Sequence, residues 1–126
     1  MKNLAHDLSK LIGVDAVKSE PEDLLAYASD ATHDHATQNP NMVVLPNGVD
    51  DVSKVLKYAS QHKIPVTPRG AGSGLAGGST PIQKGIVLDM KRMNAIIEIN
   101  RGNMTAVVES GVVLGQFHHI VESQNL

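Results

Sequence analysis

Apolar residues recur at helical spacing near the amino terminus and predict two short helices. The first covers residues 3–12 and ends at Gly13, with one apolar face formed by Leu4, Leu8, Leu11 and Ile12. The second begins at Ser19-Glu20-Pro21-Glu22, which combines a capping box with a Pro in the first turn, and runs to about Ser29. Residues 30–41 are polar and aperiodic, which predicts a loop.

Farther along the chain, short apolar runs predict strands. They lie at residues 42–45, 85–90, 95–99 and 105–109, and a further strand begins at Ile64-Pro65-Val66. Asp50 is expected to cap a helix over residues 50–62, whose core-facing side chains are Val52, Val55, Leu56 and Ala59. A strand, a helix and a strand in this order predict a βαβ unit with parallel strands.

The last part of the chain predicts a hairpin and a closing helix. Arg101-Gly102-Asn103 separates the last two apolar runs and is typical of a hairpin turn. The helix is marked by Leu114, Phe117, Ile120 and Val121. Either this helix packs back on the second sheet, or the chain is the front portion of a longer protein. We favour the second alternative, because no further strand follows the helix before Leu126.

Composition narrows the classes of function. The chain has 126 residues, 41% of them apolar and 2% aromatic, a net charge of -2 and no Cys. This length fits one domain, and scarce aromatics without a basic run argue against nucleic-acid binding. The absence of Cys excludes a disulfide, a thiolate metal site and a Cys nucleophile. With no signal peptide and no apolar run of roughly 18–20 residues, we expect a cytoplasmic protein without a transmembrane segment.

The most informative segment follows the run at Ile64-Pro65-Val66. Six of the eleven glycines fall between residues 70 and 85. Backbone without side chains can approach a ligand closely, and its N–H groups can converge on an anion. We therefore expect a cradle for a phosphate or pyrophosphate, with Arg69 as a candidate counter-charge. The alternative is a glycine loop that only reverses the chain between parallel strands.

Two common phosphate-binding motifs fit this segment poorly. Gly72-Ser73-Gly74-Leu75-Ala76-Gly77 satisfies the G-x-G-x-x-G pattern, but the Rossmann fold also needs a helix that opens at this turn. Residues 77–81 show no helical period, and Asp89, which lies near the distance of a ribose-binding acid, has no crossover helix before it. Rossmann binding is therefore disfavoured. The P-loop is excluded, because no Lys-Ser/Thr pair follows the glycines.

Several motifs in order resemble those of a known family. They are Val43-Val44-Leu45-Pro46, residues 51–56, residues 64–74, residues 85–94 and Val108-Glu109-Ser110-Gly111-Val112. The chain resembles the FAD-linked oxidases and dehydrogenases of the vanillyl-alcohol-oxidase type, nearest to the glycolate oxidase flavoprotein subunit and D-lactate dehydrogenase. The likeness covers about residue 20 to the end.

The resemblance implies an α+β fold, the PCMH-type FAD-binding domain. Residues 1–41 would form a helical lead-in, residues 42–91 a parallel βαβ subdomain with the glycine-rich turn, and residues 92–126 the start of a second subdomain with an antiparallel or mixed sheet. The residues implied in FAD binding are Pro46, Pro68, Arg69, Gly70, Ala71, Gly72, Ser73, Gly74, Gly77, Gly78, Ser79, Glu109 and Gly111.

The same resemblance implies the N-terminal part of a 2-hydroxy-acid dehydrogenase or oxidase, which passes a hydride from substrate to FAD in the full enzyme. Some relatives carry a flavin-linked His where Ser73 stands here, so non-covalent FAD is expected. No catalytic residue is found, because the resemblance implies that these residues belong to a substrate domain that we expect to be absent from this chain. Exposed apolar surface predicts a homo-oligomer. The alternative is a nucleotide-binding or interaction module without catalysis.

Other candidate chemistry is weaker. His33-Asp34-His35 is typical of a solvated loop rather than a metal site, and the adjacent His118 and His119 point apart on a helix. Ser73 and Ser79 lack the strand–Ser–helix elbow of a hydrolase nucleophile.

Overall fold

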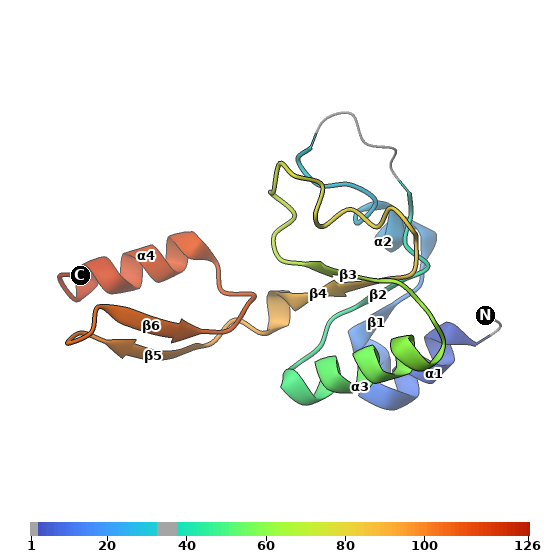
Figure 1. Cartoon of the computed structure of the whole chain (residues 1–126), viewed down its shortest axis with the longest axis horizontal. Coiled ribbons are helices and arrows are strands. Elements are labelled where there is room, and N and C mark those ends of the chain that lie inside the picture. Colours follow the sequence, from blue (N-terminus) through green and yellow to red (C-terminus); the bar gives the residue numbers. More distant parts are fainter. Residues whose placement is uncertain (1–2, 33–37) are drawn as a thin grey trace.

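The computed structural model describes residues 3–32 and 38–126. These residues form two units that lie side by side (Figure 1). The first contains a sheet in the order β1-β2-β4-β3, and the second is the hairpin β5-β6 with helix α4 beside it. The predicted α+β class is confirmed. No helix in the described part of the chain is long and apolar enough to cross a membrane.

The first sheet is parallel at its centre. β2 (Met42–Val44) and β3 (Val66–Arg69) both pair in parallel with β4 (Ile86–Asp89), which confirms the predicted parallel strands. β1 (Val17–Lys18) adds an antiparallel edge on β2 and was not predicted, because two residues show no period. The glycine-rich segment connects β3 to β4, so it leaves the sheet at the carboxyl end of β3.

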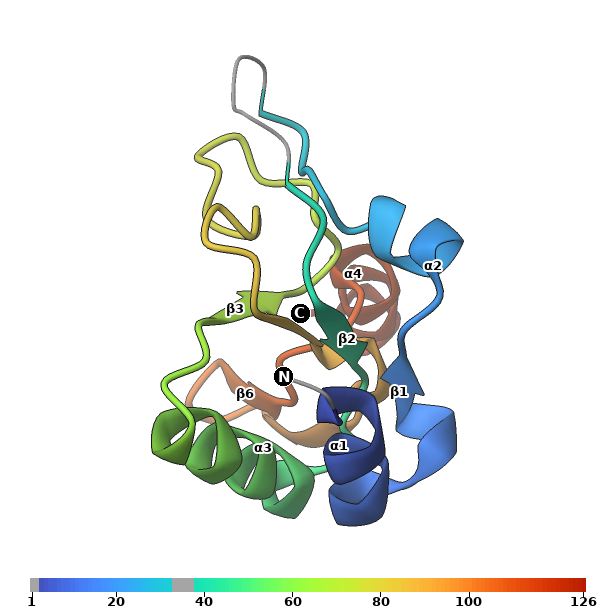
Figure 2. The ribbon, with the colours of Figure 1, turned by 90° about the vertical axis from the view of Figure 1, so that its right-hand side faces the viewer.

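Helices cover both faces of this sheet, as Figures 1 and 2 show. On one face α1 (Leu4–Ile12) and α3 (Val49–Gln61) enclose the main core, formed by Leu4, Leu8, Ile12, Ala16, Met42, Val44, Val55, Ala59, Ile86 and Leu88. On the other face α2 (Pro21–Leu25) and the turn after it cover a smaller core of Val43, Leu45 and Val87. Successive residues of β2 and β4 therefore alternate between two cores.

Three details of the first unit differ from the sequence predictions. The second helix ends at Leu25 instead of about Ser29, because the N–H of Tyr27 donates to the Leu24 carbonyl at 3.1 Å and tightens the chain into a turn. It has no side-chain cap at Ser19. The strand predicted to begin at Ile64 begins at Val66 as β3 (Val66–Arg69), because the Ile64 N–H still donates to the Ala59 carbonyl at 2.9 Å in the turn after α3.

Helix α3 departs from its prediction at the cap and on one face. Its N-cap is Gly48 and not Asp50, while the Asp51 carboxylate reaches back and accepts the Asn47 N–H at 3.0 Å. Leu56 is 45% exposed, so its predicted place in the core was wrong. Tyr58 faces inward instead, because its hydroxyl donates to Asp7 of α1 at 2.7 Å.

The second unit consists of β5 (Ile96–Asn100), β6 (Thr105–Val108) and α4 (Leu114–Ser123). The strands pair antiparallel around the predicted turn. Helix α4 lies along the hairpin (Figure 1), with a small cavity of about 180 Å³ lined by side chains of both, among them Ile99, Ala106, Phe117 and Val121. The predicted hairpin and closing helix are confirmed. Whether the chain is the front portion of a longer protein stays a prediction.

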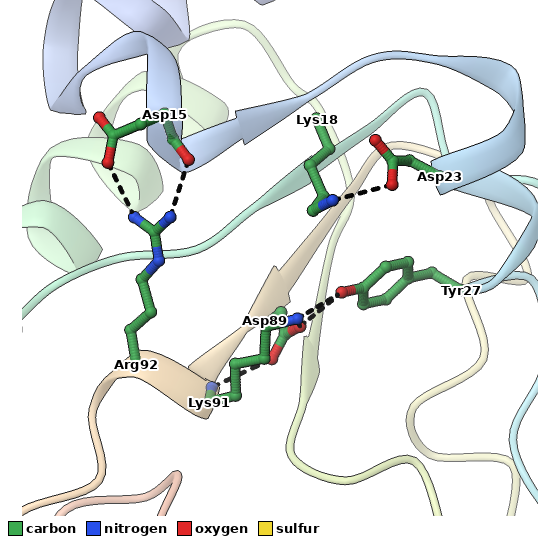
Figure 3. Close-up of polar contacts among 7 residues, drawn as sticks. All are labelled: Asp15, Lys18, Asp23, Tyr27, Asp89, Lys91 and Arg92. Carbon is green, nitrogen blue, oxygen red and sulfur yellow. Dashed lines mark hydrogen bonds and ion pairs between the residues drawn. The ribbon is translucent and has the colours of Figure 1, made fainter.

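A short 3-10 helix, η2 (Met90–Arg92), leads from β4 to the second unit. Arg92 fixes its position, donating to the Asp15 carboxylate at 3.2 Å and to the Asp15 carbonyl at 2.8 Å (Figure 3). The chain returns at Gly111, whose N–H donates to the Met93 carbonyl at 2.8 Å. A Cβ at Gly111 would overlap the Met90 carbonyl oxygen, so only glycine allows this approach.

Candidate cofactor-binding site

The glycine loop, residues 70–79, follows the carboxyl end of β3 directly. It consists of bends and turns, and no helix lies between β3 and β4. This geometry lacks the helix N-terminus on which Rossmann binding of a pyrophosphate depends. An anion at this loop would be held by backbone amides instead.

The front of the loop offers such amides. Within the described part of the chain, the N–H groups of residues 71–74 donate no hydrogen bond. Gly72 has φ +70, and a Cβ there would collide with the guanidinium of Arg69. The backbone conformation at Gly72 therefore depends on glycine, and it leaves consecutive donors available to a ligand.

The back of the loop is attached to the segment after α2. The Gly77 N–H donates to Thr32 Oγ1 at 2.8 Å, and Ser79 Oγ donates to Asp30 Oδ2 at 3.4 Å. Asp30 also accepts the Thr32 N–H at 2.9 Å, and this backbone bond is the main cause that lowers the pKa of its carboxyl. The Gly77 amide and the Ser79 hydroxyl thus hold the loop against the segment that contains Asp30 and Thr32.

Arg69 also contributes to this attachment. Its Nη1 donates to the Ser29 carbonyl at 2.7 Å and approaches the Ser79 carbonyl at 3.5 Å. The guanidinium carbon lies 5.4 Å from the ring centroid of Tyr27, in a cation–π arrangement. Among the described residues no carboxylate pairs with Arg69. The side chain proposed from sequence as a counter-charge therefore holds the loop to its neighbours.

The remaining residues implied in FAD binding lie around the loop and at the second unit. Pro46 follows β2 and is fully buried, and Pro68 is an exposed residue of the edge strand β3. The Glu109 carboxylate accepts the Ala95 N–H at 2.8 Å, which fixes the start of β5 rather than presenting the carboxylate to a ligand. Gly111 lies where the two units meet.

Two cavities meet at Gly70 and Ala71. The first, which we call the Tyr27 cavity, has a volume of about 320 Å³ and is lined by Ala26, Tyr27, Arg69, Gly70, Ala71, Asp89 and Lys91. The second, the Gly111 cavity, measures about 370 Å³ and lies between the loop and the second unit, lined by Gly70, Ala71, Lys91 and residues 110–115. The glycine loop therefore forms the wall between two hollows, of which one opens between the units.

A polar cluster beside these cavities was missed from sequence. Asp89, 3% exposed at the end of β4, accepts the Tyr27 hydroxyl at 2.7 Å and pairs with Lys91 Nζ at 3.3 Å (Figure 3). Burial and the bond to Asp89 raise the pKa of the Tyr27 hydroxyl. Tyr27 and Asp89 are 62 positions apart, so no local pattern reveals this contact.

The candidate metal ligands of the sequence stay apart from this site. His33-Asp34-His35 lies outside the described residues. His118 and His119 are exposed on α4, where His118 Nε2 lies 3.7 Å from Glu122. Neither lines the cavities at the loop.

A glycine loop whose amides at residues 71–74 donate to no described residue, next to a cavity between two units, is typical of a nucleotide-binding protein. Comparison with known proteins agrees: the family described as FAD binding domain matches residues 40–126. The chain belongs to this family of FAD-linked oxidoreductases.

Individual relatives support this assignment. The chain is 35% identical over 125 residues to glycolate oxidase subunit GlcD of Bacillus subtilis (strain 168), covering 99% of this chain and 26% of that protein. It is 34% identical over 101 residues to D-lactate dehydrogenase of Anaerostipes hadrus, covering 77% of this chain and 21% of the relative. The chain thus spans about a quarter of the length of these relatives.

A solved structure shows the same fold. The crystal structure of p-cresol methylhydroxylase with substrate bound superposes with a TM-score of 0.84 and 32% identity, over 97% of this chain and 24% of that one. The prediction of a PCMH-type FAD-binding fold is confirmed.

The residues present fit an FAD diphosphate. The amides of residues 71–74, which donate to no described residue, are the kind of donor that binds phosphate oxygens. Gly72 permits the positive φ of this turn, and the Arg69 guanidinium packs against it. Both cavities at the loop carry a cationic side chain.

Proposed function

We propose that this chain is the FAD-binding N-terminal portion of a flavin-dependent dehydrogenase or oxidase for a small 2-hydroxy acid of the glycolate or D-lactate type. The observation that carries the proposal is the run of amides at residues 71–74, which donate no hydrogen bond to any described residue. The substrate class rests on the names of the relatives.

In this proposal the amides from Arg69 through Gly74 bind the diphosphate of FAD. Gly77, Gly78 and Ser79 continue the same turn, and Asp30 and Thr32 keep it in place. Pro46 and Pro68 lie close to the cofactor, and Glu109 and Gly111 belong to the turn that faces it. FAD, when bound, supplies the acceptor for the hydride of the substrate. The groups that take the substrate's proton belong to the remainder of the longer protein.

We further propose that FAD is held without a covalent bond. Ser73 is exposed on the loop, and a Ser hydroxyl does not form the linkage that the His of some relatives forms. Acid precipitation of the flavin-loaded protein should therefore release all the flavin into the supernatant. Flavin that stays with the precipitated chain would contradict this part of the proposal.

Ligand titration tests the assignment of the site. We expect FAD and ADP to shift the amide resonances of residues 71–74 in NMR spectra. Gly72→Val should weaken FAD binding at least about tenfold, because a β-branched residue strains the backbone at φ +70 and displaces the Arg69 guanidinium that packs there. Gly48→Ala, with open space around its new Cβ, is the control and should bind normally. Binding of NAD without FAD or ADP would refute the flavin assignment.

The substrate class needs the longer protein. Its flavin should be bleached anaerobically by glycolate or D-lactate. If the flavin binds and no 2-hydroxy acid bleaches it, the dehydrogenase proposal fails. A nucleotide-binding module without catalysis then explains the fold better.

A further inference from the structure

Lys91 is the cationic side chain that lines both cavities at the glycine loop. It begins in η2, the connection between the two units, and contributes to the Tyr27 cavity and to the Gly111 cavity. Its side chain is 56% exposed, so the ammonium group is accessible from the cleft. The sequence analysis did not single it out, because one Lys after a strand carries no motif.

The contacts of Lys91 hold its ammonium group in one place. Nζ donates to the Tyr27 hydroxyl oxygen at 3.2 Å and lies 3.3 Å from Asp89 Oδ2 (Figure 3). The Lys91 backbone N–H donates to Asp89 Oδ1 at 3.0 Å. An ammonium group has three N–H donors, so one remains for a ligand.

Arg69 is less able to serve as this cation. Its guanidinium is occupied by the Ser29 carbonyl at 2.7 Å, by the Tyr27 ring and by the close packing of Gly72. Nη1 could bind an anion only by leaving the Ser29 carbonyl, and a shift of the guanidinium toward a ligand would give up its contact with the Tyr27 ring. Lys91 needs no such change.

The charges around the two cavities also favour an anionic ligand. Asp89 is buried and its carboxylate accepts from the Tyr27 hydroxyl, from the Lys91 N–H and from Lys91 Nζ. Arg69 and Lys91 together with Asp89 leave one net positive charge at the two cavities. A diphosphate brings negative charge, which a nearby cation stabilises strongly where water is excluded.

We propose that Lys91 binds the diphosphate of FAD held at the glycine loop, and that Tyr27 and Asp89 are positioning residues for its ammonium group. This inference rests on the proposed function of the glycine loop as the diphosphate site. It adds a side chain from outside the loop to the diphosphate site. It also gives Asp89, buried at the end of β4, a role in holding that side chain. Arg69 then acts on the loop and not on the ligand.

The test compares variants by NMR titration of the 126-residue chain with ADP, a method that also measures millimolar affinities. Lys91→Gln should weaken ADP binding about tenfold, while Lys91→Arg, which keeps the charge, should stay within about threefold of the wild type. The difference should shrink in high salt. Lys57→Gln, on α3 at the other face of the sheet, is the control for loss of one surface charge.

Two further variants separate binding from folding. In the double variant Asp89→Asn/Lys91→Gln no buried charge is left unpaired, so it should fold and bind ADP as weakly as Lys91→Gln. In Tyr27→Phe the pKa of Lys91, which the Tyr27 hydroxyl raises, should fall when followed by NMR of the Lys91 side chain. A Lys91 pKa that stays unchanged in Tyr27→Phe would refute the role of the Tyr27 hydroxyl in positioning the ammonium group.

The outcomes are distinct. If ADP shifts residues 71–74 and Lys91→Gln binds it as tightly as the wild type, the role of Lys91 is refuted and the loop site stands. If neither FAD nor ADP shifts these amides in the wild type, the proposed function fails and the role of Lys91 fails with it.

Discussion

The two units of the molecule differ sharply in burial. Every residue of β2 and β4 is buried, whereas all four residues of β6 are exposed and α4 has no buried residue. The first sheet has helices on both faces, and the hairpin has one helix beside it. An isolated two-stranded hairpin is marginally stable in water. The glycine loop therefore extends from the better-buried unit, and the chain returns from the hairpin to that unit at Gly111.

A matched pair of valines gives the largest expected contrast. Val87 is fully buried at the centre of β4, and Val107 is 50% exposed on β6. Val87→Ala should lower the free energy of unfolding by about 2–4 kcal/mol, because it loses apolar burial and leaves a cavity between the cores. Val107→Ala should change it by less than about 0.5 kcal/mol. Urea unfolding measures both, and equal losses would contradict the comparison.

The connection between the units offers a second pair of variants. Gly111→Ala places a Cβ onto the Met90 carbonyl oxygen and should break the bond from the Gly111 N–H to Met93. We expect a cost of about 1–3 kcal/mol, concentrated in the second unit. Amide hydrogen exchange should therefore accelerate in β5 and β6 and stay unchanged in β2 and β4.

Gly115→Ala is the control for that substitution. It lies in the first turn of α4 with no atom near its new Cβ, and alanine favours a helix by about 0.5–1 kcal/mol over glycine. Exchange in the hairpin should therefore stay the same or slow. If Gly111→Ala leaves exchange in β5 and β6 at the wild-type rate, the connection does not determine the order of the second unit.

Much of the first unit and of the glycine loop could be predicted from sequence, because short local patterns determine them. Apolar runs define β2 and β4, and the density of glycines defines the loop before any fold is known. Long-range contacts could not be predicted: Tyr27 meets Asp89 across 62 positions. The exposure of Leu56 depends on how α1 packs on α3, which the helical period of one segment does not determine.

The smallest expected effect is a loss of stability at alkaline pH, which involves tyrosines of the first unit only. Both tyrosines, Tyr27 and Tyr58, belong to the first unit and donate to carboxylates. Burial and the bond to Asp89 raise the pKa of Tyr27, and the bond to Asp7 raises that of Tyr58 above 10.0. A raised folded-state pKa contributes stability that is complete below the unfolded pKa and is lost as pH rises through the folded one. The free energy of unfolding should therefore fall above about pH 10.

The double variant Tyr27→Phe/Tyr58→Phe isolates this contribution. It lacks both hydroxyls, so the difference between its unfolding free energy and that of the wild type should narrow as pH rises from 9 to 11.5. Lysines still titrate in the double variant, and the comparison removes most of their effect, except for Lys91, whose pKa the Tyr27 hydroxyl raises in the wild type. Because the second unit has no tyrosine, the narrowing of this free-energy difference and the rise in tyrosinate absorbance should both report on the first unit alone. If this difference in unfolding free energy stays constant across the range, the two hydroxyls do not contribute to the pH dependence of stability in the first unit.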